Sequence, residues 1–168
     1  MKKTVLTLAI SWSIGSAALA QVPPAAPQPP ARGPSLALAV EAARTALDTC
    51  TAKEQKVSVS VVDSAGVLKA LLATDGASPR GVQSSTNKAV TAISFKTPTS
   101  LLGERIKTDK ELADKVAANP AYNSRAGGVL IRVNDEIIGA IGVGGARGSE
   151  NDEACALAGL AKIQGRLL

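Results

Sequence analysis

The chain has 168 residues, with 19 basic and 14 acidic side chains, a formal net charge of +5 and no histidine. It contains one Phe, one Tyr and one Trp, so it lacks the stacking platform that binds single-stranded nucleic acid, and its charge is too weak for a duplex-binding face. Without histidine, Ser-His-Asp triads, Cys-His dyads and histidine proton shuttles are excluded. A metal site is also disfavoured, because there is no paired-cysteine motif either.

Residues 1–20 have the pattern of a secretory signal peptide. Lys2 and Lys3 form a positive start, residues 5–14 are mostly apolar, and residues 18–20 form a small-residue cleavage site. The apolar run is short for a membrane span, although an uncleaved anchor is the alternative. We therefore expect a periplasmic or secreted mature protein, with 17 basic and 14 acidic residues and a net charge of +3.

Residues 21–34 contain six prolines and no apolar periodicity, which predicts an extended, flexible linker. The remaining residues, 35–168, have the length of one domain. Ser35 is a natural helix N-cap. After it, apolar residues recur at helical spacing and predict one buried stripe, at Leu36, Val40, Ala43, Leu47 and Cys50.

Two hairpins are expected further along the chain. Valines at 57, 59 and 61 alternate with serines, which predicts a half-buried strand that turns at residues 63–66 and returns over residues 67–73. The second hairpin is expected over residues 129–133 and 136–143. Helices are predicted between and after the hairpins, at 82–96, 100–107, 109–118 and from Ser149 onward. This order predicts an α/β (α+β) fold, with helices packed on a mostly antiparallel sheet.

Cys50 and Cys155 both fall on predicted helices. In an oxidising compartment a disulfide between them is plausible, and a loop of roughly 100 residues would gain about 4 to 5 kcal/mol in the chain-entropy model. The alternative is two buried free thiols that pack as small apolar residues.

Two motifs are incomplete. The glycines at 139, 142, 144, 145 and 148 do not match a dinucleotide fingerprint, and no lysine follows them as a phosphate loop requires, so we expect them to allow close backbone approach. Ser85 and Lys88 have the Ser-x-x-Lys spacing of penicillin-interacting enzymes, but the accompanying motifs are absent. Lys88 is more simply explained as part of a solvated helix face.

A series of short phrases between residues 57 and 156 resembles one family. They are Val57–Asp63, Asp75-Gly76-Ala77, Lys88–Ala92, Phe95–Thr99, Gly127-Gly128 with Ile131–Val133, Ile138–Val143 and Asp152–Ala156. In order and spacing they are similar to the GlcG/HbpS-like haem-binding family. The resemblance covers nearly all of residues 35–168 and implies a profilin-like α/β sandwich that assembles into a homo-oligomer.

The resemblance also implies a ligand pocket and its cofactor, haem or another tetrapyrrole. Seven of the expected ligand-binding residues come from the segments that border this pocket in the family, and they are Asp75, Arg80, Lys88, Thr97, Arg125, Gly127 and Gly128. Arg80, Lys88 and Arg125 are suited to pair with carboxylates such as haem propionates, and a solvated surface charge is the alternative for each.

The chain departs from its relatives at two positions. Val67 stands where many members have a histidine, and Val90 where a tyrosine often follows the lysine–alanine pair. Haem iron is usually held by His, Cys, Met or Tyr, and the lone methionine leaves with the signal peptide. If the cysteines are bridged, Tyr122 is the remaining candidate ligand.

The sequence therefore favours an exported haem- or tetrapyrrole-binding protein without a clear catalytic centre. The alternative is an accessory enzyme or lyase acting on a small anionic metabolite, with Lys88, Asp75 and Arg125 as working groups. A flat apolar slot would favour the tetrapyrrole, and a polar cavity with a buried Lys88 would favour the metabolite.

Overall fold

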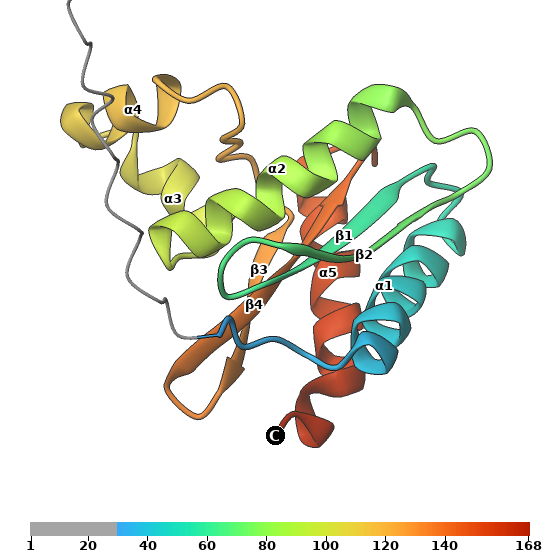
Figure 1. The fold of residues 1–168 in the computed structure, drawn as a ribbon. Coiled ribbons are helices and arrows are strands. Elements are labelled where there is room, and N and C mark those ends of the chain that lie inside the picture. The colour runs from blue at the N-terminus through green and yellow to red at the C-terminus, as the bar shows by residue number, and fades with distance from the viewer. Residues whose placement is uncertain (1–29) are drawn as a thin grey trace, which may run out of the picture.

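The computed structural model describes residues 30–168, so the predicted signal peptide and most of the predicted linker lie outside the described residues. The elements in chain order are α1 (Leu36–Thr51), β1 (Ser58–Asp63), β2 (Leu68–Ala73), α2 (Pro79–Phe95), α3 (Thr99–Arg105), α4 (Lys110–Ala117), β3 (Gly128–Val133), β4 (Glu136–Gly144), α5 (Ser149–Ile163) and the 3-10 turn η1 (Gln164–Arg166) (Figure 1).

The four strands form one sheet in the order β2-β1-β4-β3, and every pairing is antiparallel. Two consecutive hairpins meet where β1 pairs with β4, with Val59 opposite Val143 and Val61 opposite Ile141. The two-hairpin, antiparallel α+β fold expected from the sequence is thus confirmed.

Helices cover both faces of this sheet (Figure 1). Helices α1 and α5 pack side by side on one face, over the larger apolar core that includes Val59, Val61, Ile141 and Val143. Helix α2 crosses the opposite face over β1, β4 and β3, above a smaller cluster around Val62 and Ala140.

Strand β1 is buried on both faces, so the prediction of a half-buried strand is wrong. Its serine face lies under α2 rather than in solvent. The Ser60 hydroxyl is satisfied there, because it lies 2.9 Å from both the Ser85 and the Thr86 hydroxyl oxygens. Ser60 is therefore a small residue that hydrogen-bonds to the helix above it, whereas the buried Ser58 hydroxyl has no hydrogen-bond partner among the described residues.

The predicted apolar stripe of α1 is correct at its C-terminal end and wrong at its start. Leu36 and Val40 are 61% and 42% exposed. The buried face instead consists of Leu47, Cys50 and four alanines, which are Ala39, Ala42, Ala43 and Ala46. Small residues are required because α5 approaches closely: a Cβ at Gly159 would collide with the Ala42 carbonyl oxygen and the Ala46 methyl group.

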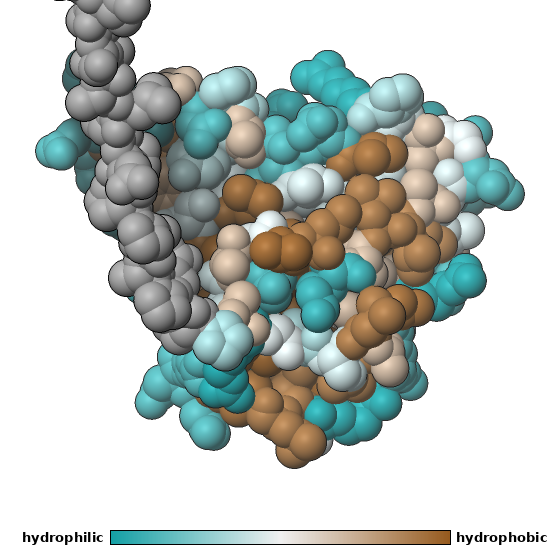
Figure 2. All heavy atoms as spheres, viewed as in Figure 1, coloured by the Kyte–Doolittle hydropathy of each residue, from teal (hydrophilic) through white to brown (hydrophobic). Residues whose placement is uncertain are grey.

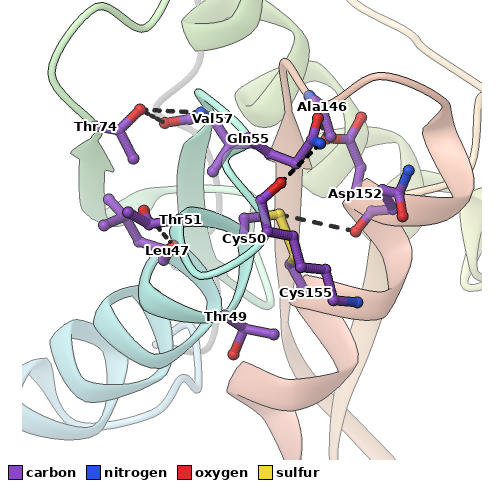
Figure 3. Close-up of a disulfide and its surroundings, with 12 residues drawn as sticks. Leu47, Thr49, Cys50, Thr51, Gln55, Val57, Thr74, Ala146, Asp152 and Cys155 are labelled. Carbon is purple, nitrogen blue, oxygen red and sulfur yellow. Dashed lines mark hydrogen bonds between the residues drawn. A yellow bond between two sulfur atoms is a disulfide. The ribbon is translucent and has the colours of Figure 1, made fainter.

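The disulfide between Cys50 and Cys155 is present and joins α1 to α5, with a Cα–Cα distance of 5.7 Å (Figure 3). It links residues 105 positions apart, near the two ends of the domain. The cysteines are fully buried between the helices and the sheet. The prediction of a bridged pair is confirmed.

Helix α2 begins three residues earlier than the sequence predicts. Ser78 is its N-cap and accepts a hydrogen bond from the Gly81 amide at 3.0 Å, while Pro79 occupies the first turn, where proline is tolerated. This start brings Arg80 and Gly81 onto the helix.

The last residues of the predicted linker pack against the domain. The backbone amide and carbonyl of Arg32 bond to Ser64, and the Arg32 side chain forms an ion pair with Glu136. Pro34 is buried. Residues 32–34 are therefore ordered along the β1–β2 turn.

The edge strand β2 carries an apolar surface that none of the helices within residues 30–168 covers. Leu68 and Leu71 point to the same side of the sheet as α2 but beyond its reach, and with Val67 they are among the exposed large apolar residues. Figure 2 shows apolar atoms gathered across this face. Among the described helices, none is long and apolar enough to cross a membrane.

Candidate functional site

A cavity of about 790 Å³ opens between α2, the loop 120–125 and the β4–α5 connection. The start of α2 contributes Arg80 and Gly81, and the start of α5 contributes Ser149 and Glu150. Most of the side chains that line it carry polar atoms, and they include the cations of Arg80, Lys88 and Arg125. We call this cavity the α2–α5 pocket.

At the base of the pocket, Lys88 of α2 and Asp152 of α5 form a buried ion pair. Lys88 Nζ donates to Asp152 Oδ2 at 2.6 Å, and the two side chains are 2% and 5% exposed. Asp152 Oδ1 accepts a second hydrogen bond, from the Ala146 amide at 3.0 Å. Lys88 is therefore not on a solvated face, because α2 turns it toward the sheet and the first turn of α5.

Burial dominates the electrostatics of this pair. Desolvation lowers the pKa of Lys88, and the nearby Arg125 cation lowers it further, against the opposing effect of Asp152. Desolvation likewise raises the pKa of Asp152, against the effect of Lys88. Relative to water, burial thus shifts both groups toward their uncharged forms, and the ion pair opposes this shift.

Gly127 and Gly128 form the wall behind the ion pair rather than the lining of the pocket. Gly127 has a φ of +122°, and a Cβ there would lie 2.8 Å from Asp152 Cβ and 2.9 Å from Lys88 Nζ. The Gly128 amide donates to Thr99 Oγ1 at 2.8 Å. Both glycines are required because the ion pair and α2 lie directly against the backbone of the strand.

The loop 120–125 is fastened to α2 by side-chain hydrogen bonds. The Asn123 amide donates to Thr91 Oγ1 at 2.8 Å, its side chain donates to Ser84 Oγ at 3.0 Å, and Asn87 donates to the Pro120 carbonyl. These contacts hold Tyr122 at the pocket, where its ring packs edge-on against Phe95 with centroids 5.0 Å apart.

The structure brings together four of the residues expected from the sequence and separates two others. Arg80, Lys88, Tyr122 and Arg125 line the α2–α5 pocket. Asp75 lines a different groove, beside the end of α1, and so does not join Lys88 and Arg125. Thr97 donates to the Phe95 carbonyl at the end of α2, and Thr99 makes the contact with the glycine wall instead.

Sequence reasoning missed Asp152 and Asn123. In the sequence, Asp152 was noted only as the first residue of the phrase Asp152–Ala156 and was not assigned to the ligand site. Its spacing nevertheless carries a signal, because it begins the buried stripe of α5 that continues at Cys155, Ala156 and Gly159. An acid on a buried helix face requires a partner. Asn123 has no such signal, since its role depends on tertiary contacts of a loop.

The family model of the haem degrading protein HbpS-like matches residues 35–161. This chain belongs to the HbpS-like family. No curated protein matches it significantly.

Solved HbpS structures share both sequence and fold with this HbpS-like chain. A crystal structure of HbpS is 34% identical, with a TM-score of 0.73, over 81% of this chain and 94% of that one. A double mutant of HbpS from Streptomyces reticuli is 33% identical, with a TM-score of 0.74, over 86% and 98%. A PduOC–haem complex, 22% identical with a TM-score of 0.71 over 77% and 94%, shows a likeness of fold alone.

Proposed function

We propose that this protein binds haem or a related tetrapyrrole in the α2–α5 pocket, through the ligand's carboxylates. The observation that carries the proposal is the convergence of Arg80 and Arg125 on one cavity whose base is closed by the Lys88–Asp152 pair. Guanidinium groups bind carboxylates through two parallel hydrogen bonds. Two arginines at one cavity are thus suited to a ligand with two propionates.

The pocket fits the acidic edge of such a ligand. Its volume of about 790 Å³ lies within the range of cofactor pockets in proteins. For the iron, the chain supplies no histidine, and both cysteines are bridged. Tyr122 is the pocket residue with an oxygen suited to ferric iron. Bound haem would supply the iron centre and the Soret absorption that reports its environment.

The comparisons support this ligand class. The family is described as haem degrading, and a protein of the same fold has been crystallised with haem. We propose binding without turnover for this chain, since its pocket contains no histidine. In the presence of ascorbate and oxygen, bound hemin should then lose its Soret band no faster than free hemin does.

Titration of the mature protein with hemin tests the proposal. We expect a saturable Soret shift, and the absence of both shift and saturation would reject tetrapyrrole binding. Tyr122→Phe keeps the ring contact with Phe95 and removes the oxygen, so it should move the Soret band of the complex. An unchanged spectrum would remove Tyr122 as the iron ligand.

We also propose that the protein is exported and forms a homo-oligomer. Export rests on the pattern of residues 1–20, and N-terminal sequencing of the protein from a fractionated host should begin at Gln21. Self-association is supported by the unpaired edge strand β2 with its exposed Leu68 and Leu71. Light scattering on the mature protein should give a mass above that of one chain.

The second candidate function is binding or conversion of a small anionic metabolite. It is favoured by the polar lining of the pocket and by the burial of Lys88, the two features that distinguish a metabolite site from an apolar slot. Its working groups are Lys88, Asp152 and Arg125, because Asp75 lies elsewhere.

A further inference from the structure

The buried amine of Lys88 has donor capacity that the protein does not use. A lysine ammonium carries three N–H donors. Within residues 30–168, Asp152 Oδ2 is the hydrogen-bond partner of Nζ, although the side chain is only 2% exposed. Donors left unpaired in such a position are costly. A neutral amine, with one donor fewer and a free electron pair, is better served by these surroundings.

Asp152 is placed to take up and return the proton. Its Oδ2 lies 2.6 Å from Nζ, and its other oxygen is held by the Ala146 amide at 3.0 Å. Burial moves the pKa of Lys88 down and that of Asp152 up, so proton transfer along this hydrogen bond is favoured over what it would be in water.

A desolvated lysine beside a second cation is the arrangement that makes an amine nucleophilic at neutral pH. Arg125 is that second cation, and together with Arg80 it places positive charge along the same cavity. We propose that Lys88 forms a Schiff base with a small oxo acid, whose carboxylate is bound by Arg80 or Arg125.

The chemistry balances without an oxidant or a reductant. The Lys88 nitrogen, as the neutral amine, forms a bond to the carbonyl carbon while the C=O π electrons move to oxygen; Asp152 gives its proton to that oxygen and takes one from the nitrogen, which yields a carbinolamine. Asp152 then protonates the hydroxyl group, which leaves as water while the C=N bond forms, and it recovers a proton from the nitrogen. One carbonyl compound and one amine give one imine and one water.

This inference deepens the second candidate function and rests on it, and it does not depend on haem binding. A carbonyl ligand in the pocket requires a negative group for the arginines and a carbonyl carbon that reaches Nζ. A 2- or 3-oxo carboxylate has both in a few atoms, whereas a neutral ketone lacks the first.

Reductive trapping with pyruvate tests the proposal directly. The mature protein is incubated with pyruvate and cyanoborohydride, and the reduced adducts are mapped by peptide mass spectrometry. We expect labelling of Lys88 to be several-fold faster than that of the exposed Lys107 and Lys110, because burial lowers the pKa of the Lys88 amine and the arginines hold the carboxylate of pyruvate in the same pocket. Equal labelling of all three lysines, or none at Lys88, would overturn the proposal.

Three comparisons sharpen the result. Acetone, which lacks the carboxylate, should show a smaller preference for Lys88 than pyruvate does, and equal preference for acetone would remove the role of the arginines. Lys88→Arg keeps the cation and should abolish the fast adduct, whereas Lys107→Arg is the matched control and should retain it. Arg80→Gln with Arg125→Gln should raise the pyruvate concentration needed for half-maximal labelling by about tenfold or more.

Failure of the Schiff base can be separated from failure of the anion site. Thermal unfolding with pyruvate, without reductant, reports binding alone. Stabilisation by pyruvate without trapping at Lys88 would overturn the covalent step and leave an anion-binding pocket. Neither stabilisation nor trapping would overturn both this inference and the second candidate function.

Discussion

At the scale of the residue, the Lys88–Asp152 pair stands apart from the other ion pairs of residues 30–168. Those pairs involve side chains that are one-third exposed or more, where a pair contributes about 0–1 kcal/mol. Lys88 and Asp152 are buried, so removing one partner leaves the other charge without compensation. The same pair therefore governs local stability and the chemistry of the pocket.

Lys88→Met and Asp152→Asn should each destabilise the fold, by about 3–5 kcal/mol, because each leaves an unpaired polar group in the core. The double variant should lose less than the sum of the two. Urea unfolding measures these values. Lys107→Met, at the exposed Glu104 pair, is the control and should change stability by no more than about 0.5 kcal/mol. Similar losses at Lys88 and Lys107 would mean that Lys88 is hydrated.

The stability difference between wild type and Lys88→Met should grow as pH rises. In the wild type, burial lowers the pKa of Lys88 in the folded state. Between that lowered pKa and 10.5 the unfolded chain therefore binds more protons than the folded one, and stability rises with pH. In the variant, the buried Asp152 loses the cation that lowers its pKa, so stability falls as pH rises above 3.8. Urea unfolding across a pH series tests this, and a shrinking difference would contradict the assigned shifts.

At the scale of the element, helix α5 joins the pocket to the core. One face of the helix carries Asp152 at the pocket, Cys155 in the disulfide and Gly159 against α1. Figure 3 shows Asp152 and the bridge within adjoining turns. Because Cys155 follows Asp152 by about one helical turn, the position of Asp152 depends on how α5 is fixed to α1.

Gly159→Ala should destabilise the protein although alanine favours helix. Its Cβ would collide with the Ala42 carbonyl oxygen, and overpacking of this kind costs about 1–3 kcal/mol, more than the ~1 kcal/mol gained in helix propensity. Gly165→Ala is the matched control, since a Cβ at that position would meet no atom within 4 Å, and should be nearly neutral. Chemical denaturation of both variants separates packing from propensity. A stabilised Gly159→Ala would show that α1 and α5 are further apart.

Removing the disulfide should lower the free energy of unfolding by about 2–5 kcal/mol without changing the fold. The Cys50→Ala, Cys155→Ala double variant leaves two small apolar side chains between the helices, so its far-ultraviolet circular dichroism should match that of wild type while its Tm falls. Thiol titration of the denatured, unreduced wild type provides the direct check. Two free thiols per chain would contradict the bridge.

At the scale of the whole molecule, local sequence patterns were sufficient to predict most helices and strands but not the contacts between them. Alternating valines and turn residues predicted the first hairpin, and the expected oxidising compartment favoured a bridge between the two cysteines. The sequence did not show that α2 covers the serine face of β1, because serine is compatible with solvent or with a hydrogen-bonding helix.

The site was predicted in part for the same reason. Family resemblance located Arg80, Lys88 and Arg125, and elimination of the other residue types that bind haem iron pointed to Tyr122; the four share one pocket. The pairing of Lys88 with Asp152 joins residues 64 positions apart and depends on how α2 and α5 cross the sheet. Such a contact has no local signature beyond an acid on a buried helical stripe.

Hemin titration of a matched set of arginine variants tests the central claim, that the α2–α5 pocket is the ligand site. The set comprises wild type, the Arg80→Gln, Arg125→Gln double variant and Arg105→Gln, whose arginine lies on α3 outside the pocket. We predict saturable binding by wild type and Arg105→Gln, and a Kd raised by about tenfold or more in the double variant, because lost charge-assisted hydrogen bonds contribute about 1.5–3 kcal/mol each. Equal affinities in all three proteins would contradict the assignment of this pocket.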